Sequence, residues 1–352
     1  MKHILRIFCL TLLILSFSII TVHATDISIE NLISGSWYGQ YSGLSGDIDV
    51  QRYMHMTIDN CDASGNFSGI ASVTTVEGQG YDHQWINYKF KGTVNPHTYE
   101  FFMQGTEKIS SDTTGDWQFA TFNGKLQYNE NNELYVAGLV DNYSHKEFYF
   151  GHVSDWAKLE ITIANLYNLI PETMKNKDLS KPITRAEFAA VATRLYEKLT
   201  NTQVQPQYST FIDIAGHPDE ESIKKAHTLN VTVGYSDTIF APNEHISREQ
   251  LATMLCRAVK KYKYPTWTFA TDDQYYVLTA GVPIYADDAL ISDYAKQSVY
   301  YMTKMGIIKG LTHNYFGPKN TTLEEIANNY ATATREQAIV MALRIFSQAE
   351  KL

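Results

Sequence analysis

The spacing of apolar residues divides the chain into two parts with different periodicity. Between residues 36 and 152, short runs rich in aromatic and β-branched residues alternate with turns containing Gly, Asn, Asp and Ser, which is typical of β-strands. Eight runs are predicted as strands, at residues 36–41, 53–58, 67–73, 86–93, 99–105, 117–126, 134–140 and 147–152. Consecutive short strands with close connections predict an antiparallel eight-stranded β-barrel over residues 27–152.

After the last predicted strand the apolar residues recur at intervals of three and four, which predicts amphipathic helices. Three apolar stripes follow this spacing, and each begins three residues after an arginine. The stripes are Phe188, Val191, Ala192 and Leu195; Leu251, Met254, Leu255 and Ala258; and Ala338, Met341, Ala342 and Ile345. This internal repeat predicts a multidomain chain of β-then-α class, in which an all-α three-repeat part follows the barrel.

The three arginines, Arg185, Arg248 and Arg335, each follow a Ser or Thr and precede a Glu or Gln two residues later. This spacing predicts a capping box at each helix start, which explains the hydroxyl and the Glu or Gln. The arginine is unexplained, because the helix dipole disfavours a cation at the first helical position by roughly 0.3–1 kcal/mol. Either a carboxylate from a neighbouring repeat or an anion bound at free helix amides would offset this cost, and the residues leave both alternatives open.

Loops marked by glycine precede two of the capped helices, with G-Y-S-D-T-I-F-A-P-N at residues 234–243 and G-I-I-K-G at residues 306–310. Together with T-R-A-E at residues 184–187, these motifs resemble the S-layer homology domain. A repeat of that family runs from an aromatic-bearing helix, through such a loop, to a capped helix. The resemblance covers about residues 153–347. It divides this part into repeats at 153–200, 208–262 and 284–348, with an aromatic insert at 263–283 between the last two.

The resemblance implies a pseudo-threefold module with grooves that bind a secondary cell-wall polysaccharide, usually one that carries a pyruvate ketal. It therefore implies a protein of the bacterial cell wall or S-layer surface, anchored without a covalent bond. The ketal carboxylate would supply the missing anion, and an aromatic side chain would stack on the sugar. Carried over to this chain, recognition falls to Arg185, Arg248, Arg335, Trp156, Tyr294, Gly234 and Gly310.

The three repeats depart from the family pattern in different ways. Repeat one has residues 168–171 where loop glycines are expected, and repeat two lacks the first-helix aromatic and offers residues 221–223 near that point. Repeat three carries Tyr294 where tryptophan is usual, and its loop is enlarged by residues 320–330. We therefore expect one or two working sites rather than three.

Residues 1–24 predict a signal peptide with a short cationic start, an uncharged apolar run over 7–22, and small residues before a cleavage site. The alternative is an uncleaved membrane anchor, because the run approaches the length that spans a bilayer. The remaining chain carries 27 Lys and Arg against 38 Asp and Glu, a net charge of −11, which argues against a nucleic-acid partner. Its two cysteines, Cys61 and Cys256, form either one disulfide or two free thiols.

The barrel contains no recognisable catalytic motif: the G-x-S-x-G, H-E-x-x-H and phosphate-loop patterns are all absent from the sequence. Residues 60–65 echo a calcium loop, but Ala71 stands where a bidentate Glu is required, so this segment is interpreted as a hairpin turn. Six aromatic residues are expected in the barrel core rather than on a ligand surface: Trp37, Phe90, Phe101, Trp117, Phe119 and Phe148.

We therefore expect a non-enzymatic barrel that needs no cofactor or metal and is displayed on the wall-binding module. Two alternatives remain. The G-S-W sequence at residues 35–37 weakly resembles the start of lipocalin-like barrels, which suggests a carrier of a small ligand tethered to the wall. Scattered carboxylates could also form a glycosidase pair, which would make the protein a wall-tethered enzyme acting on polysaccharide.

Overall fold

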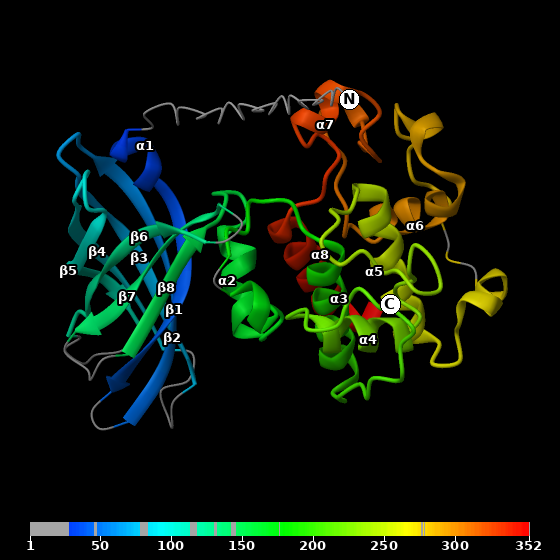
Figure 1. Ribbon diagram of the computed structural model, residues 1–352, viewed down its shortest axis with the longest axis horizontal. Coiled ribbons are helices and arrows are strands. Elements are labelled where there is room, and N and C mark those ends of the chain that lie inside the picture. The colour runs from blue at the N-terminus through cyan, green and yellow to red at the C-terminus, as the bar shows by residue number, and fades with distance from the viewer. Residues whose placement is uncertain are drawn as a thin grey trace, which may run out of the picture.

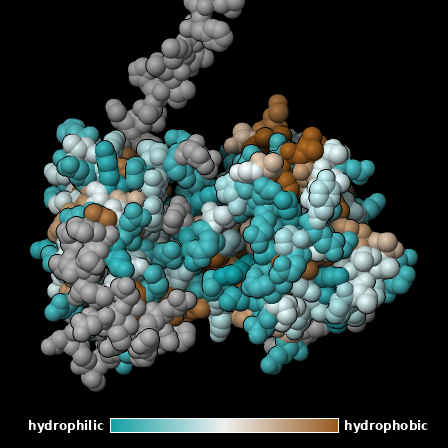
Figure 2. All heavy atoms as spheres, turned by 60° about the horizontal axis from the view of Figure 1, so that its bottom comes forward, coloured by the Kyte–Doolittle hydropathy of each residue, from teal (hydrophilic) through white to brown (hydrophobic). Residues whose placement is uncertain are grey.

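The computed structural model describes residues 28–45, 48–77, 84–112, 118–129, 132–141, 146–175, 177–275, 277 and 279–351. The predicted signal peptide and Trp117 lie outside these residues. Figure 1 shows a β-barrel on one side and a helical part on the other, with helix α2 (Lys158–Leu166) between them. Within the described residues, no helix is both long and apolar enough to cross a membrane. The face of the molecule in Figure 2 is mostly hydrophilic over both parts.

The eight predicted strands are confirmed, and they form one closed antiparallel barrel in sequence order. The barrel closes where β1 pairs with β8, from Trp37 opposite His152 to Tyr41 opposite Phe148. The first two strands extend well beyond their predicted ends. The strands are β1 (Gly35–Ser45), β2 (Ile48–Cys61), β3 (Asn66–Glu77), β4 (Trp85–Val94), β5 (Glu100–Ser111), β6 (Thr121–Tyr128), β7 (Leu134–Asp141) and β8 (Lys146–His152).

Aromatic side chains fill the barrel core. The Phe122 ring lies edge-on to Tyr41 and to Phe148, with ring centroids 5.0 and 5.2 Å apart. Helix α1 (Ile29–Ile33) adds its isoleucines to the same core, and the Trp37 indole donates a hydrogen bond to the Ile33 carbonyl (2.8 Å). Of the aromatic residues predicted to be core, Trp37, Phe90, Phe101 and Phe148 are buried and Phe119 is half-buried.

The C-terminal part is helical. Three pairs of helices form what we call units 1, 2 and 3: α2 with α3, α4 with α5, and α6 with α8. The α-helices after α2 are α3 (Arg185–Thr200), α4 (Glu220–Thr228), α5 (Arg248–Lys263), α6 (Asp293–Lys304), α7 (Leu323–Ala327) and α8 (Arg335–Ser347). The short 3-10 helices are η1 (Glu172–Met174), η2 (Phe269–Gln274), η3 (Asp288–Leu290), η4 (Thr312–Asn314) and η5 (Ala349–Lys351).

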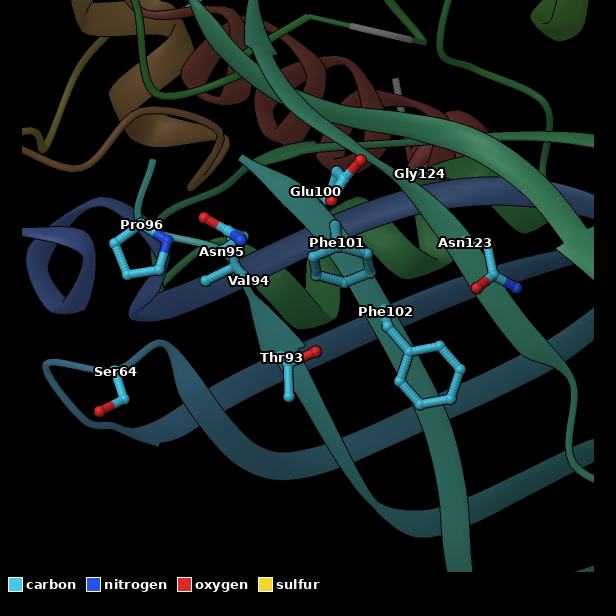
Figure 3. Close-up of a pocket in the computed structure, with 10 residues that line it drawn as sticks. All are labelled: Ser64, Thr93, Val94, Asn95, Pro96, Glu100, Phe101, Phe102, Asn123 and Gly124. Carbon is cyan, nitrogen blue, oxygen red and sulfur yellow. The ribbon is translucent and has the colours of Figure 1, made fainter. Parts of the chain in front are cut away.

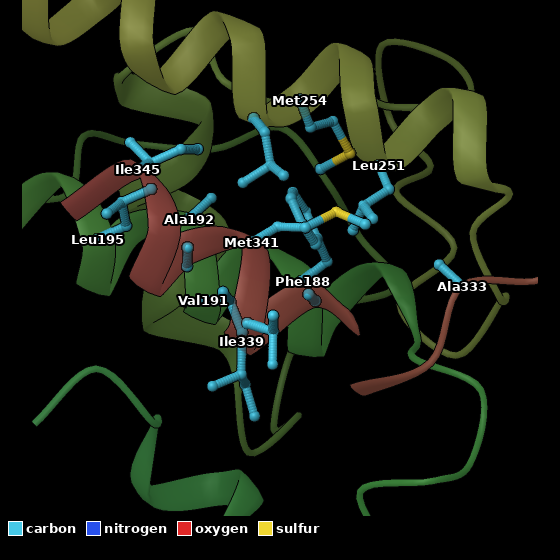
Figure 4. Packing of buried hydrophobic residues seen from close by; sticks show 14 of the residues in the cluster. Phe188, Val191, Ala192, Leu195, Leu251, Met254, Ala333, Ile339, Met341 and Ile345 are labelled. Carbon is cyan, nitrogen blue, oxygen red and sulfur yellow. The ribbon is translucent and has the colours of Figure 1, made fainter. Parts of the chain in front are cut away.

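The three predicted capping boxes are all present, at the starts of α3, α5 and α8. The apolar stripes of these three helices meet in one core, as Figure 4 shows for Phe188, Met254 and Met341. Helix α7 was not predicted, and it lies in the enlarged loop of unit 3.

A closed cycle of three backbone hydrogen bonds joins the segments that precede the capped helices. Ile183 donates to the Ala333 carbonyl (2.9 Å), Ala333 to Ile246 (3.0 Å), and Ile246 back to Ile183 (3.3 Å). The three units are therefore arranged with pseudo-threefold symmetry. We call these bonds the central cycle.

The first amides of each capped helix donate to backbone carbonyls of another unit. The amide of Arg185 donates to Glu244 (2.8 Å) and that of Arg335 to Lys181 (3.0 Å), and the amide of Arg248 donates to Ala331 (3.0 Å). The next amide of each helix is used in the same way. Of the two alternatives, an anion bound at free helix amides does not apply to these amides, because the neighbouring unit occupies them.

The barrel is fastened to unit 1 by hydrogen bonds. The Tyr38 hydroxyl, on the outside of β1, donates to the carbonyls of Met174 (3.0 Å) and Lys175 (3.1 Å). The Leu179 amide donates to the His152 carbonyl at the end of β8 (2.9 Å). Burial of the Tyr38 hydroxyl raises its pKa above the ordinary value. These bonds fix the helical part against the seam at which the barrel closes.

Replacing Gly39 by alanine is expected to destabilise the barrel at this seam. A Cβ at Gly39 would overlap the backbone oxygen of Tyr149 and lie 2.6 Å from the Phe150 ring. The oxygen belongs to the β1–β8 pairing and cannot move freely, so we expect Gly39→Ala to lower the free energy of unfolding by about 1–3 kcal/mol. Urea unfolding followed by tryptophan fluorescence measures the change. Gln40→Ala, at the half-buried neighbouring position, is the control, and equal midpoints for the two variants would contradict the expectation.

Candidate functional site

Arg185 and Arg248 are buried beneath the loop of the following unit, where their N–H groups are directed to backbone carbonyls. Arg185 donates to Phe240 (Nε, 2.9 Å) and to Val233 (Nη2, 2.8 Å), and Arg248 donates to Phe316 (Nε, 2.9 Å). Each guanidinium also lies over an aromatic ring, at 4.8 Å from the centroid of Phe240 and 5.3 Å from that of Phe316. Burial lowers the pKa of both arginines. For these two residues, carbonyl oxygens and ring faces supply the negative partner.

Arg335 is neutralised by two carboxylates. Its Nε lies 3.0 Å from both oxygens of Glu187, and its Nη1 lies 2.5 Å from Glu133 Oε1. Glu187 is the capping-box residue of unit 1, so a carboxylate from a neighbouring repeat, one of the two sequence alternatives, is present here. Glu133 comes from the barrel, in the turn before β7, and was not foreseen. Burial alone would lower the pKa of Arg335, but the two carboxylates raise it.

Site A is a pocket of about 230 Å³ that brings predicted residues from different units together. It joins Arg185 of unit 1, Val233 of the unit 2 loop, the α5 face with Met254 and Arg257, and Tyr294 of unit 3. The Tyr235 ring lies 4.6 Å from the Arg185 guanidinium. Tyr235 and Tyr294 are 61% and 56% exposed, so both rings are accessible to a ligand.

The predicted glycines Gly234 and Gly310 have a packing role in the loops. A Cβ at Gly234 would overlap the Ser236 carbonyl oxygen and lie 2.5 Å from the Phe211 ring. A Cβ at Gly310 would lie 2.8 Å from the Tyr285 ring. Both glycines are therefore needed for the close approach of the loop backbone to an aromatic ring.

Each first-helix aromatic is paired with a buried glutamate at the second position of a capped helix, a pairing that we did not predict. Glu249 accepts from the Tyr294 hydroxyl (3.3 Å) and the Ser292 amide (2.9 Å). Glu336 accepts from the Ser154 amide (2.9 Å) and from Trp156, which is 53% exposed. Burial raises the pKa of Glu336, and these hydrogen bonds partly offset the rise.

The junction between units 1 and 2 lacks both halves of this pairing. Helix α3 has Ala186 at the glutamate position. The first helices of the units align at their ends, where the Leu169, Val231 and Ile307 amides each donate to the carbonyl five residues earlier. Counting back from these ends places Pro218 where the other units have Trp156 and Tyr294. The role of these glutamates could have been predicted from the sequence. A capped helix has Glu at its second position only where the following unit has Trp or Tyr at the aromatic position.

The pseudo-threefold relation defines two further sites, which differ from site A. Site B surrounds Arg248 and includes Gly310 and Trp156 at the equivalent positions. Site C is a pocket of about 510 Å³ beside Arg335, lined also by Glu187, Lys177 and the barrel residue Glu133. Since Arg335 is already paired with the carboxylates of Glu187 and Glu133, the protein itself supplies the anions of site C.

The barrel has a separate concavity of about 610 Å³ on its outer surface. Figure 3 shows Thr93, Phe102 and Asn123 lining it, and these residues form a cross-strand row on β4, β5 and β6. None of the described residues that line this concavity is basic. Among the described residues, no cluster of His, Cys, Asp and Glu has the arrangement of a metal site.

Cys61 and Cys256 are free thiols, so the second of the two cysteine alternatives is confirmed.

Residues 210–252, which form most of unit 2, match the family model of the S-layer homology domain. The resemblance inferred from the motifs is therefore confirmed. The chain is also 28% identical over 221 residues to an amylopullulanase of Thermoanaerobacterium thermosulfurigenes, and 29% identical over 126 residues to a cellulosome-anchoring protein of Acetivibrio thermocellus. These alignments cover 61% and 36% of this chain, but only 11% and 28% of the relatives' own lengths.

Replacing Glu187 by alanine is expected to destabilise the helical part strongly at neutral pH. The change leaves Arg335 and Lys177 without their shared carboxylate, and removing one partner of a buried ion pair costs about 3–5 kcal/mol. Burial would raise the pKa of Glu187, but the two cations outweigh it and hold the pKa below 4.5. Its stabilising effect is therefore complete above about pH 4.5 and is lost as the pH falls through the lower, folded-state pKa.

Thermal unfolding of Glu187→Ala and the unchanged protein, followed by circular dichroism from pH 7 to pH 3, tests this expectation. The control is Glu107→Ala, which removes an exposed ion pair to Lys89 (2.9 Å) and is expected to cost less than about 1 kcal/mol. A difference between Glu187→Ala and the unchanged protein that stays constant down to pH 3 would show that the pairing is not electrostatic.

Proposed function

We propose that residues 153–347 form a three-repeat S-layer homology module that tethers the protein, without a covalent bond, to an anionic polysaccharide of the bacterial cell wall. The observation that carries this proposal is site A, where Arg185, Tyr294 and the loop of Gly234 converge although they come from three units. The family match supports it for unit 2. Units 1 and 3 share the capping box of unit 2 and take part in the central cycle with it, which supports the same assignment for them.

The anion is proposed to be the carboxylate of a pyruvate ketal on a secondary cell-wall polysaccharide. Such a group combines a planar carboxylate, which a guanidinium binds well, with a sugar ring whose apolar face can pack on an aromatic side chain. Tyr294 lines this pocket and Tyr235 lies against its Arg185, so two accessible rings are close to the proposed ligand. Sites A and B are proposed to contact the polysaccharide, with its carboxylate in site A, because the arginine of site C is already paired with Glu187 and Glu133.

The barrel is proposed to be a non-enzymatic domain displayed at the cell surface after residues 1–24 are removed. Its interior is packed with side chains such as Trp37, Phe122 and Phe148, all with no exposed surface, which supports a structural core rather than a binding cavity. The name of the anchoring relative is consistent with a surface location. The amylopullulanase match covers too little of that protein to transfer its activity.

Replacing either accessible tyrosine of site A by alanine is expected to weaken binding to isolated cell walls. Loss of a ring that packs on the sugar should reduce affinity by roughly tenfold, or about 1.4 kcal/mol. Co-sedimentation of Tyr235→Ala and Tyr294→Ala with walls at a series of concentrations measures this change. Tyr208→Ala is the matched control, since Tyr208 is 90% exposed and lines neither site A nor site C.

The same assay tests the wall ligand itself. Walls from which the secondary polysaccharide has been extracted should no longer sediment the unchanged protein. Equal sedimentation with intact and extracted walls would refute the tethering proposal.

The full-length protein is expected to release no reducing sugar from a panel of cell-wall and plant polysaccharides. The physical reason is the packed barrel interior and the presence of one carboxylate, Glu100, among the described residues that line the outer concavity, since glycoside hydrolysis needs a pair. A reducing-sugar assay with a known glycosidase as positive control makes the measurement. Reproducible turnover that is lost on heating the protein would favour the wall-tethered enzyme instead.

A further inference from the structure

A second arginine recurs in all three capped helices, nine residues after the first, at Arg194, Arg257 and Arg344. In α8, Arg344 forms a bidentate pair with Glu160 of α2, at 2.8 Å (Nε to Oε1) and 3.0 Å (Nη2 to Oε2). In α3, Arg194 donates to the Asn168 carbonyl (2.8 Å). Two of the three second arginines therefore have a hydrogen-bonded partner within the protein.

Arg257 differs from the other two. Within the described part of the chain, its guanidinium makes no hydrogen bond and lies within ion-pair distance of no carboxylate. One face of the guanidinium lies over the Phe269 ring, 4.6 Å from its centroid. Burial lowers the pKa of Arg257, and the more distant Asp272 only partly offsets this. A half-buried cation with unused donors is costly unless something else supplies the charge.

The missing partner can be traced to one position in the first helix. The first helices align at the carbonyl that accepts the hydrogen bond closing each helix, which belongs to Ala164 in unit 1 and to Met302 in unit 3. Glu160 lies four residues before Ala164. The equivalent position in α6 is therefore Ser298. A serine is neutral and too short to replace a glutamate, so Arg257 has no carboxylate where Arg344 has one.

The insert between units 2 and 3 holds Arg257 in place. Trp267 is fully buried, and its indole donates to Asp272 (2.7 Å), which also pairs with Lys260 (2.5 Å). These contacts fix η2, which carries the Phe269 ring beneath the guanidinium. The insert thus keeps one face of Arg257 covered and leaves its edge for another partner.

Arg257 lines site A together with Arg185 and Tyr294. Arg185 already donates to two carbonyls through Nε and Nη2, whereas Arg257 donates to none of the described residues, so Arg257 is the cation of this pocket with all of its donors unused. We propose that Arg257 binds the carboxylate of the wall polysaccharide in site A, in the bidentate manner in which Arg344 binds Glu160. This inference rests on the proposed function and names the residue that gives site A its preference for an acidic sugar. Site B contains its own carboxylate at this position and lacks that preference.

The test uses the full-length protein with two probes: isolated cell walls, and a hexose pyruvate ketal compared with its methyl ester by isothermal titration calorimetry. The unchanged protein is expected to bind the acid at least tenfold more tightly than the ester. Arg257→Gln is expected to bind the acid and the ester equally, and its affinity for walls in the co-sedimentation assay is expected to fall at least tenfold. Arg257→Lys, which keeps the charge but not the planar fork, is expected to lie between them.

Arg194→Gln is the matched control, because it makes the same change at the equivalent position in α3, where Arg194 donates to the Asn168 carbonyl and lines neither site A nor site C. It is expected to bind both probes as the unchanged protein does. Ser298→Glu is a gain-of-partner variant, since a glutamate there would occupy Arg257 as Glu160 occupies Arg344, and it should bind neither probe in site A. Circular dichroism of each variant shows whether the fold is retained, and Arg257→Lys keeps the test decisive if Ser298→Glu does not fold.

The outcomes separate this inference from the proposed function. Undiminished wall and ketal binding by Arg257→Gln would overturn the role of Arg257 while leaving the tether intact. Equal binding of acid and ester by the unchanged protein, or binding to walls but not to the acid ketal, would overturn the carboxylate assignment. Failure of the unchanged protein to sediment with walls would instead refute the proposed function.

Discussion

The central cycle of backbone hydrogen bonds is the constraint on which the helical part depends. Because Ile183, Ala333 and Ile246 each donate to the next, the start of every capped helix is placed against the loop of another unit. The first amides of the helix then donate to carbonyls of that loop. These carbonyls offset the positive end of the helix dipole, which explains how a cation is tolerated at the first helical position three times.

Pseudo-threefold symmetry in the backbone coexists with a different charge balance at each site. Arg335 is surrounded by carboxylates, one of them Glu133 from the barrel, so this site joins the two domains rather than remaining open. Arg185 and Arg248 are directed to carbonyls and aromatic rings, which compensate a charge without forming an ion pair. The same position of the repeat is therefore a domain contact in one unit and part of a pocket wall in another.

Local patterns predicted most of the secondary structure. The strands follow from aromatic and β-branched runs between turns, and the capped helices follow from hydroxyl and Glu or Gln side chains three residues apart, since both signals act within a few residues. Helix α7 was missed although Thr322 and Glu325 form the same capping box, because its five residues are too few to show an apolar stripe. The second arginines were also visible as a nine-residue spacing, but nothing local distinguishes a paired arginine from an unpaired one.

The sequence by itself determined the barrel, the three capped helices, and the set of arginines and aromatic residues that define the sites. Only the tertiary structure decided what each arginine contacts. The reason is distance along the chain: Arg335 and Glu133 are 202 residues apart, and Arg344 and Glu160 are 184 apart, so their contact depends on how the units close around the central cycle. For the same reason the sequence marked the three equivalent arginines at the start of the capped helices. The folded chain instead singles out Arg257, one of the second arginines, as the cation of site A that has no hydrogen-bonded partner among the described residues.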